Sequence, residues 1–228
     1  VIEVTGDYVA SPTIRTTFVF GTGSLDLNLA GDYSQSGAVH RFTTNAAAIF
    51  NLNLTGDFSY GTSTMSATVG SQANLNFVSS ATQAYTGTGT VTGPINYFVE
   101  GTTSLNLATS SLRGTGTFTL RSTASLQAGA FNGSGTNTAG AIQTGTTQGN
   151  IRVSGVRTYE DESTIIYNGA AAQQLGAGHP TATIVNTVIQ NGLSVTTVGS
   201  RTISGDLTLV SGNLAIAGAT ALTSNRNI

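Results

Sequence analysis

The sequence predicts an all-β chain coiled into a right-handed parallel β-helix, a β-solenoid with rungs of about 20–25 residues. Two observations predict this fold class: short alternating segments fill most of the chain, and one phrase recurs every 25 residues. The copies read IEVTGDYVASP from residue 2, LNLAGDYSQSG from residue 27 and LNLTGDFSYGT from residue 52. A fixed period of this length is typical of repeat architectures, in which each unit buries its apolar face against the next.

The alternating segments predict strands. Runs such as SLDLNLAG, ANLNFV, GTFTLRS and STIIYNG place apolar residues at every second position and end at Gly, Ser, Asn or Thr. This pattern is typical of strands that bury one face and turn at their ends. No segment shows the 3.6-residue apolar stripe of an amphipathic helix, and β-branched Thr and Val are frequent. We therefore expect strands and turns throughout.

Spacing also predicts which residues stack. Leu105 and Leu126 are 21 residues apart, which indicates a shorter rung, and Leu126 aligns with Ile151 one 25-residue period later. A longer unit recurs as NFVSSATQAYTGTG from Asn76 and IYNGAAAQQLGAG from Ile166. About nine rungs at the usual strand spacing would form a rod roughly 40 Å long. A β-sandwich would explain the strands but not this register.

The composition indicates a folded segment. Charged residues make up only 8% of the 228 residues and the net charge is −2, whereas disordered chains combine low hydrophobicity with high net charge. The pattern begins inside one repeat and stops as abruptly, and the first residues lack the basic and apolar regions of a signal peptide. We interpret residues 1–228 as one β-solenoid repeat segment of a longer chain.

Residue types exclude several classes of partner and site. All eight basic residues are Arg and they form no cluster, so nucleic-acid binding is not expected. No apolar run approaches the ~18 residues of a membrane-spanning helix. Cysteine is absent, which excludes disulfides and cysteine metal sites. His40 and His179 have no further metal-binding residues at suitable spacing, and we interpret both as structural or exposed.

A column of aspartates is the sharpest candidate site. Asp7, Asp32 and Asp57 follow the glycine of each 25-residue copy, so stacked rungs would place them about 5 Å apart. One interpretation is a calcium ladder, because Ca²⁺ takes carboxylate oxygens as ligands. The other is corner chemistry, in which Gly permits the turn and Asp accepts a nearby backbone N–H. Apart from calcium, we expect no cofactor.

Two further predictions follow from the same registers. Tyr8, Tyr33 and Phe58 share one position of the repeat, so they should stack as an aromatic column in the core or at its rim. The only acidic cluster is Glu160–Asp161–Glu162. Neighbouring side chains of a strand point to opposite faces, so we interpret this cluster as a solvated turn rather than a cation site.

An enzymatic role is not expected. Hydrolysis of a polysaccharide needs paired carboxylates, and outside the two acidic groups the acids are isolated, Asp26 near Asp32 included. Arg41 or Arg157 could be assigned to a lyase only arbitrarily. The glycine-rich phrases lack the Lys of a phosphate loop, and no Ser lies in a nucleophile elbow. The Thr rows of an ice-binding face do not persist from rung to rung. We predict no catalytic residue.

These phrases resemble the β-helix repeat regions of large cell-surface, adhesin-like proteins that Bacteroidota export by type IX secretion. The likeness is carried by TIIYNGAAAQQLGAG, by NTVIQNGLSVTTVGSRTISGDLTLVSGNLAIAG and by GTGTVTGPINYFV, and such phrases run through most of residues 75–218. The GDY and GDF copies resemble the class more loosely. The chain departs from it in having no recognisable C-terminal sorting domain and no lectin module.

The resemblance implies a non-enzymatic stalk or fibre segment of a secreted cell-surface protein, extracellular and serving attachment or matrix structure. Its expected partners are neighbouring domains of the parent chain, further copies joined through exposed rung edges as a filament, and surface polysaccharide. The alternative is a carbohydrate-binding or polysaccharide-cleaving β-helix, which a groove lined by acidic and aromatic residues would favour.

Overall fold

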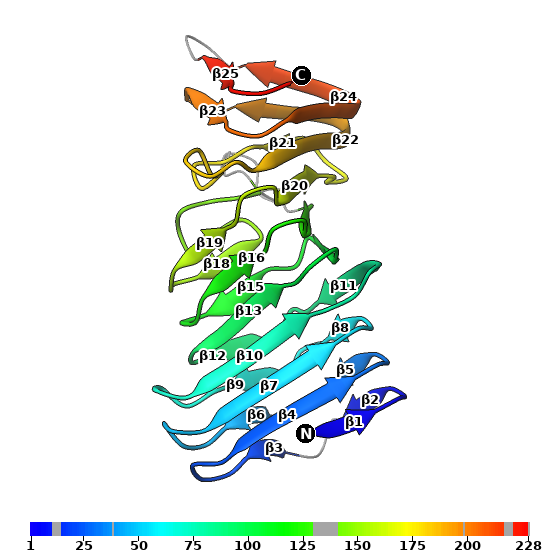
Figure 1. Ribbon diagram of the computed structural model, residues 1–228, viewed down its shortest axis with the longest axis vertical. Coiled ribbons are helices and arrows are strands. Elements are labelled where there is room, and N and C mark those ends of the chain that lie inside the picture. The colour runs from blue at the N-terminus through cyan, green and yellow to red at the C-terminus, as the bar shows by residue number, and fades with distance from the viewer. Residues whose placement is uncertain (11–14, 38, 130–140, 198, 217–220, 228) are drawn as a thin grey trace.

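The computed structural model describes residues 1–10, 15–37, 39–129, 141–197, 199–216 and 221–227. In these residues the chain winds into a parallel β-solenoid of about nine rungs, with about 23 residues in each rung and no helix (Figure 1). The N-terminal rung and the C-terminal rung lie at opposite ends of the long axis. The predicted all-β solenoid class is confirmed.

Two long sheets run along the axis, and every pairing within them is parallel. The first sheet has seven strands in the order β1 (Ile2–Val4), β4 (Ser24–Leu29), β7 (Ile49–Leu54), β10 (Gln72–Phe77), β13 (Ile95–Val99), β16 (Phe118–Leu120) and β19 (Arg157–Tyr159). The second contains β2 (Tyr8–Ala10), β5 (Tyr33–Gln35), β8 (Phe58–Ser59), β11 (Thr82–Thr86), β14 (Ser104–Ala108), β17 (Ser125–Ala128), β20 (Thr164–Tyr167), β22 (Asn186–Thr197), β21 (Gln173–Gln174) and β24 (Leu207–Ile216).

Shorter sheets close the remaining side of the coil. They are the four-stranded sheet of β3 (Thr16–Val19), β6 (Val39–Thr43), β9 (Thr64–Ser66) and β12 (Thr90–Thr92), and the pairs β15 (Leu112–Gly114) with β18 (Ile151–Val153) and β23 (Arg201–Ile203) with β25 (Leu222–Ser224). Towards the C-terminal end the rungs change shape. The long strand β22 pairs with β20 through its first residues and with β21 through its last.

The strand register confirms the repeat read from the sequence. Ile2 pairs with Leu27 and Leu27 with Leu52, which is the 25-residue period. Leu105 pairs with Leu126, which is the shorter 21-residue rung. These residues point inward and bury one another's apolar surface, as a stack of individually unstable rungs requires.

One predicted stacking is wrong. Leu126 pairs with Ile165 rather than with Ile151, and Ile151 instead pairs with Leu112. The chain between β17 and β18 makes a long excursion, so the 25-residue spacing there joins two different sides of the coil. Alternation alone could not reveal this, because any inward-facing apolar residue fits the same pattern.

The second repeated phrase encodes a corner rather than a whole rung. Phe77 ends a strand of the first sheet, whereas Tyr167, its counterpart, ends a strand of the second. What the two copies share is a buried glutamine. The amide of Gln83 donates to the Leu54 carbonyl at 2.9 Å, and that of Gln173 donates to the Ala128 carbonyl at 2.7 Å. Each glutamine thereby satisfies a carbonyl of the rung below inside the core.

The predicted aromatic column is confirmed and lies in the core. The rings of Tyr8, Tyr33, Phe58 and Tyr85 stack with centroid distances of 5.0, 4.7 and 5.3 Å and interplanar angles of 18°, 4° and 6°. All except Tyr8, in the first rung, are fully buried. Each step adds ring stacking to the area that the rungs bury.

Two files of side-chain amides run along the outer face of the first sheet. In one file Asn28 donates to Glu3, Asn53 to Asn28 and Asn76 to Asn53, at 2.6–2.7 Å. The second file contains the successive partners Asp26, Asn51, Asn74 and Asn96, at 2.5–2.9 Å. Every amide donates towards the N-terminal rung, and each file ends on a carboxylate. Stacked amides of this kind support a single register between rungs.

Candidate functional site

The structure brings the three predicted site residues into one file along a corner of the coil. The backbone N–H of Asp32 donates to Asp7 Oδ1 at 2.9 Å, and that of Asp57 donates to Asp32 Oδ1 at 2.7 Å. Asp57 Oδ1 in turn accepts the N–H of Ala84 at 2.7 Å. Each carboxylate therefore accepts an amide of the next rung, as the corner interpretation expects.

The calcium ladder stays a prediction. In the described part of the chain no group of three or more His, Asp or Glu residues is close enough together to hold a metal ion. Calcium that raised the melting temperature, with chelation reversing the rise, would support binding by Asp7, Asp32 and Asp57. A melting temperature indifferent to both additions would count against it.

Substitutions at Asp32 separate the two functions of its side chain. We expect Asp32→Asn to be nearly neutral, because the amide oxygen still accepts the N–H of Asp57. Asp32→Ala leaves that N–H without its acceptor and should cost about 1–2 kcal/mol of unfolding free energy. Urea unfolding of the two variants measures the difference. Equal losses would contradict this account.

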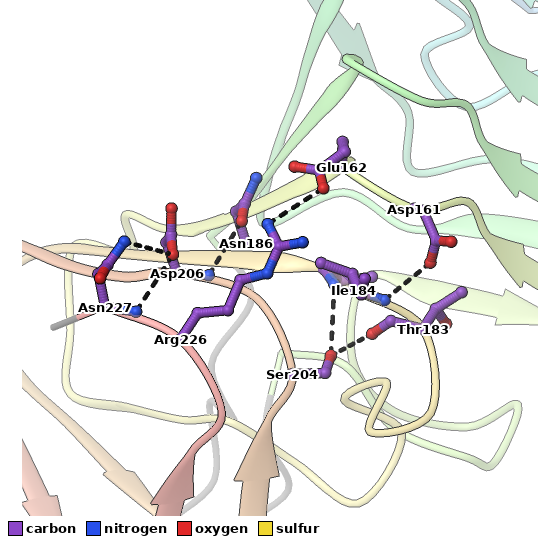
Figure 2. A network of polar contacts seen from close by, with 10 residues as sticks. Asp161, Glu162, Thr183, Ile184, Asn186, Ser204, Asp206, Arg226 and Asn227 are labelled. Atoms are coloured by element: carbon purple, nitrogen blue, oxygen red, sulfur yellow. Dashed lines mark hydrogen bonds and ion pairs between the residues drawn. The ribbon is translucent and has the colours of Figure 1, made fainter.

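The same corner device recurs at the C-terminal end, where we had not predicted it (Figure 2). Asn186 Oδ1 accepts the N–H of Asp206 at 3.0 Å, and Asp206 Oδ1 accepts that of Asn227 at 3.3 Å. Asp161 Oδ1 accepts the N–H of Ile184 at 2.9 Å. The sequence signal was present in the Gly205–Asp206 dipeptide, which repeats the Gly-Asp of the first three rungs.

The acidic cluster forms a turn, as predicted. Asp161 and Glu162 are exposed in that turn, and Glu162 lies 3.1 Å from Arg226 in an ion pair. Glu160 accepts a hydrogen bond from Arg121 at 2.6 Å, which holds the pKa of its carboxyl below the usual value. A general acid of glycoside hydrolysis needs the opposite shift, so Glu160 does not have the character of one.

The largest hollow in the described part of the molecule is a groove with a volume of about 700 Å³ beside the C-terminal third of the coil. We call it the lateral groove. Three stretches of chain line it, namely 143–146, 153–159 and 177–183. The volume lies within the range of small-molecule sites, about 300–1,000 Å³. None of the lining residues is acidic.

The lateral groove exists because the first sheet stops at β19. The chain leaves the stack after Gly178, whose N–H still donates to the Ile142 carbonyl at 3.0 Å. It rejoins at Ile184, whose carbonyl accepts the N–H of Glu162 at 2.7 Å. Pro180 lies between these points and has no N–H to donate, so this stretch is poorly suited to continue the sheet.

His179 anchors the loop that closes the groove. Its Nδ1 lies 2.8 Å from the Tyr167 hydroxyl and its Nε2 lies 3.2 Å from the Thr187 hydroxyl, all inside the core. The structural interpretation of His179 is confirmed. His40 is buried as well, with Nδ1 3.4 Å from the Tyr33 hydroxyl.

Burial of His179 predicts a pH dependence of stability. Desolvation lowers the pKa of its imidazole to about 4, whereas that of an unfolded chain is about 6.5. The unfolded state therefore binds the proton first as the pH falls. Stability should be fully present above pH ~6.5 and decline towards pH ~4, by at most about 1.4 kcal/mol per pH unit. His179→Gln should flatten this slope in urea unfolding series, and an unchanged slope would refute the assignment.

Arg157 occupies an inward-facing position above Phe118 at the base of the groove. Its guanidinium donates to the carbonyls of Gln143, Gly145 and Val153, the last two at 2.9 Å. Burial lowers the pKa of this side chain. In the described residues ion pairs are formed by Arg121 and Arg226, so Arg157 is a half-buried cation without a carboxylate partner.

Comparison with known proteins leaves the fold as the firmest description of this chain. No protein-family model matches it, and comparisons with curated proteins and with solved structures found no match. The resemblance to surface proteins of Bacteroidota is therefore supported at the level of a β-solenoid repeat fold. Among the described residues there is no helix long and apolar enough to cross a membrane.

Proposed function

We propose that this chain is a structural segment, a stalk or fibre element, of a secreted bacterial cell-surface protein and that it has no enzymatic activity. The observation that carries the proposal is the uninterrupted stacking of about nine rungs. Backbone ladders, the two amide files and the aspartate corners all bond one rung to the next along the long axis. Such a stack supports a role in spacing or in bearing load.

The exterior supports the same role. Its outward side chains are mainly Thr, Ser and Asn, and charged residues are 8% of the chain. Several carboxylates already accept backbone amides or pair with arginine, including Asp32, Asp57 and Glu160. A neutral surface with its polar groups engaged is suited to projecting from a cell without indiscriminate attraction to charged partners.

Association of rung ends extends the proposal to filaments. At the C-terminal end β24 pairs with β22 alone, and Leu209, Val210 and Ile216 are at least half exposed. A further rung, from the parent chain or from another copy, would cover these side chains and satisfy the strand edge. Analytical ultracentrifugation across a concentration series measures this. A strictly monomeric chain would remove the filament variant.

Two experiments test the proposed function. Antibodies against the chain, applied to intact cells of the source organism, should label the cell surface in immunogold microscopy. Labelling confined to the cell interior would overturn the location. Purified protein incubated with a panel of neutral and acidic polysaccharides, with added calcium, should release neither reducing sugars nor unsaturated products. Product above the blank would overturn the non-enzymatic role.

The alternative of polysaccharide cleavage lacks a specific supporting observation. We expected such a function to use a groove lined by acidic and aromatic residues. The lateral groove has Tyr159 but no carboxylate in its described lining, and hydrolysis requires a carboxylate pair. Among carbohydrate-related functions the groove therefore favours binding over cleavage.

A further inference from the structure

We propose that the lateral groove is a binding site for a carboxylate-bearing saccharide, and that Arg157 recognises the carboxylate. This inference goes beyond the structural role, because a stalk functions with or without a lateral ligand. It rests on the charge of the groove, on the hydrogen-bond donors that remain free there, and on the chemistry of its walls.

The charge of the groove is the first step. Arg157 is the only charged residue in its lining, and none of the ten Asp and Glu residues of the chain lies there. A half-buried guanidinium attracts an anion more strongly than an exposed one does, because water screens it less. The groove is thus locally cationic on a chain whose net charge is −2.

Free donors are the second step. A guanidinium has five N–H donors, and three hydrogen bonds to carbonyls leave Arg157 with two. The backbone adds more. Phe118 N donates to the Val156 carbonyl at 3.0 Å, so by the alternation of a parallel ladder the N–H groups of Arg157 and Tyr159 face away from β16. In the described chain β19 has no strand on that side.

The walls are the third step, and they indicate a saccharide rather than a small anion. Six hydroxyl side chains line the groove, from Thr144, Thr146, Ser154, Thr158, Thr181 and Thr183. They can donate to and accept from the hydroxyls of a sugar, while Val153 and Pro180 offer apolar contact for a ring face. A volume of about 700 Å³ exceeds what a lone carboxylate fills.

Calorimetric titration with trigalacturonate tests the proposal, with galactotriose as the neutral trisaccharide and acetate as the bare carboxylate. We expect trigalacturonate to bind at least about tenfold more tightly than either, since a charge-assisted hydrogen bond contributes that much or more. Arg157→Gln should reduce the affinity about tenfold or more. Arg15→Gln removes the same charge from an exposed site outside the groove and should leave the affinity unchanged.

A second variant is needed, because Arg157 also holds the carbonyls of 143–153 in place. Ala182→Trp fills the groove from an exposed position and leaves Arg157 intact, so it should abolish binding without lowering the melting temperature. Ala47→Trp, in an exposed turn outside the groove, is the matched control and should bind as the parent does.

Several outcomes would overturn the proposal. They are no binding of trigalacturonate at millimolar concentration, equal binding of galactotriose, equal binding of acetate, and unimpaired binding by Ala182→Trp. Each leaves the structural role untouched, since surface labelling and the absence of polysaccharide cleavage are measured independently of this groove.

Discussion

Replacing Phe58 with alanine should lower the free energy of unfolding by about 3–5 kcal/mol. Phe58 is fully buried, and its ring stacks on Tyr33 at 4.7 Å and on Tyr85 at 5.3 Å. The truncation therefore removes both stacking partners at once and leaves a cavity between two rungs. Neighbouring rungs cannot close that cavity, because their spacing is fixed by the backbone ladders on either side.

Thermal and urea unfolding measure this loss. For a chain of this length we expect a fall in melting temperature of about 10 °C. Phe20→Ala is the matched control, because Phe20 is 74% exposed and its truncation removes little buried surface. If the two variants lost similar stability, the aromatic column would not be a principal source of stability in this fold.

The repeating column was predictable because its members keep strict spacing. Tyr8, Tyr33 and Phe58 are 25 residues apart, and in a parallel stack equal spacing around the coil becomes direct contact. The same reasoning placed Asp7 and Asp32 in one file. Sequence spacing suffices where every rung has the same length, since only the register then has to be found.

The amide files show where a signal was present but not used. Asn28 and Asn53 are 25 residues apart, and Asn76 follows 23 residues later. Outward-facing Asn in a strand is usually solvated, so this spacing drew no attention. In the stack each amide is half-buried by its neighbours, and hydrogen bonding along the file becomes its most favourable arrangement.

The lateral groove could not be predicted from the sequence. It arises where a rung fails to add its strand to the first sheet, and the His179–Pro180 dipeptide marks that point. Pro180 signalled a loop end, but not that a sheet would end on β19. Arg157 was equally unpromising, because its inward direction depends on pairing with Phe118, 39 residues earlier. An irregular excursion of the chain separates the two, and periodicity does not extend across it.

Replacing Gly56 with alanine should destabilise the protein by about 3 kcal/mol, although it adds a single methyl group. A Cβ at this position would collide with the Gly31 carbonyl and the Asp32 carboxylate of the rung below. Both groups are held in place, since Asp32 Oδ1 accepts the N–H of Asp57 and the Gln83 amide donates to the Gly56 carbonyl at 2.5 Å. Neither can yield without breaking a bond between rungs.

Gly6→Ala is a stringent control, because Gly6 occupies the same column one end of the stack away and a Cβ there meets nothing within 4 Å. Both glycines precede an aspartate and neither has a positive φ, so helix or turn propensity predicts the same cost for both. Only contact between rungs distinguishes them. A large loss in Gly56→Ala with little change in Gly6→Ala, measured by urea unfolding, would attribute the repeated Gly-Asp to close stacking of corners. Equal losses would show instead that glycine serves the local turn in each copy, and that the rungs do not need it in order to approach.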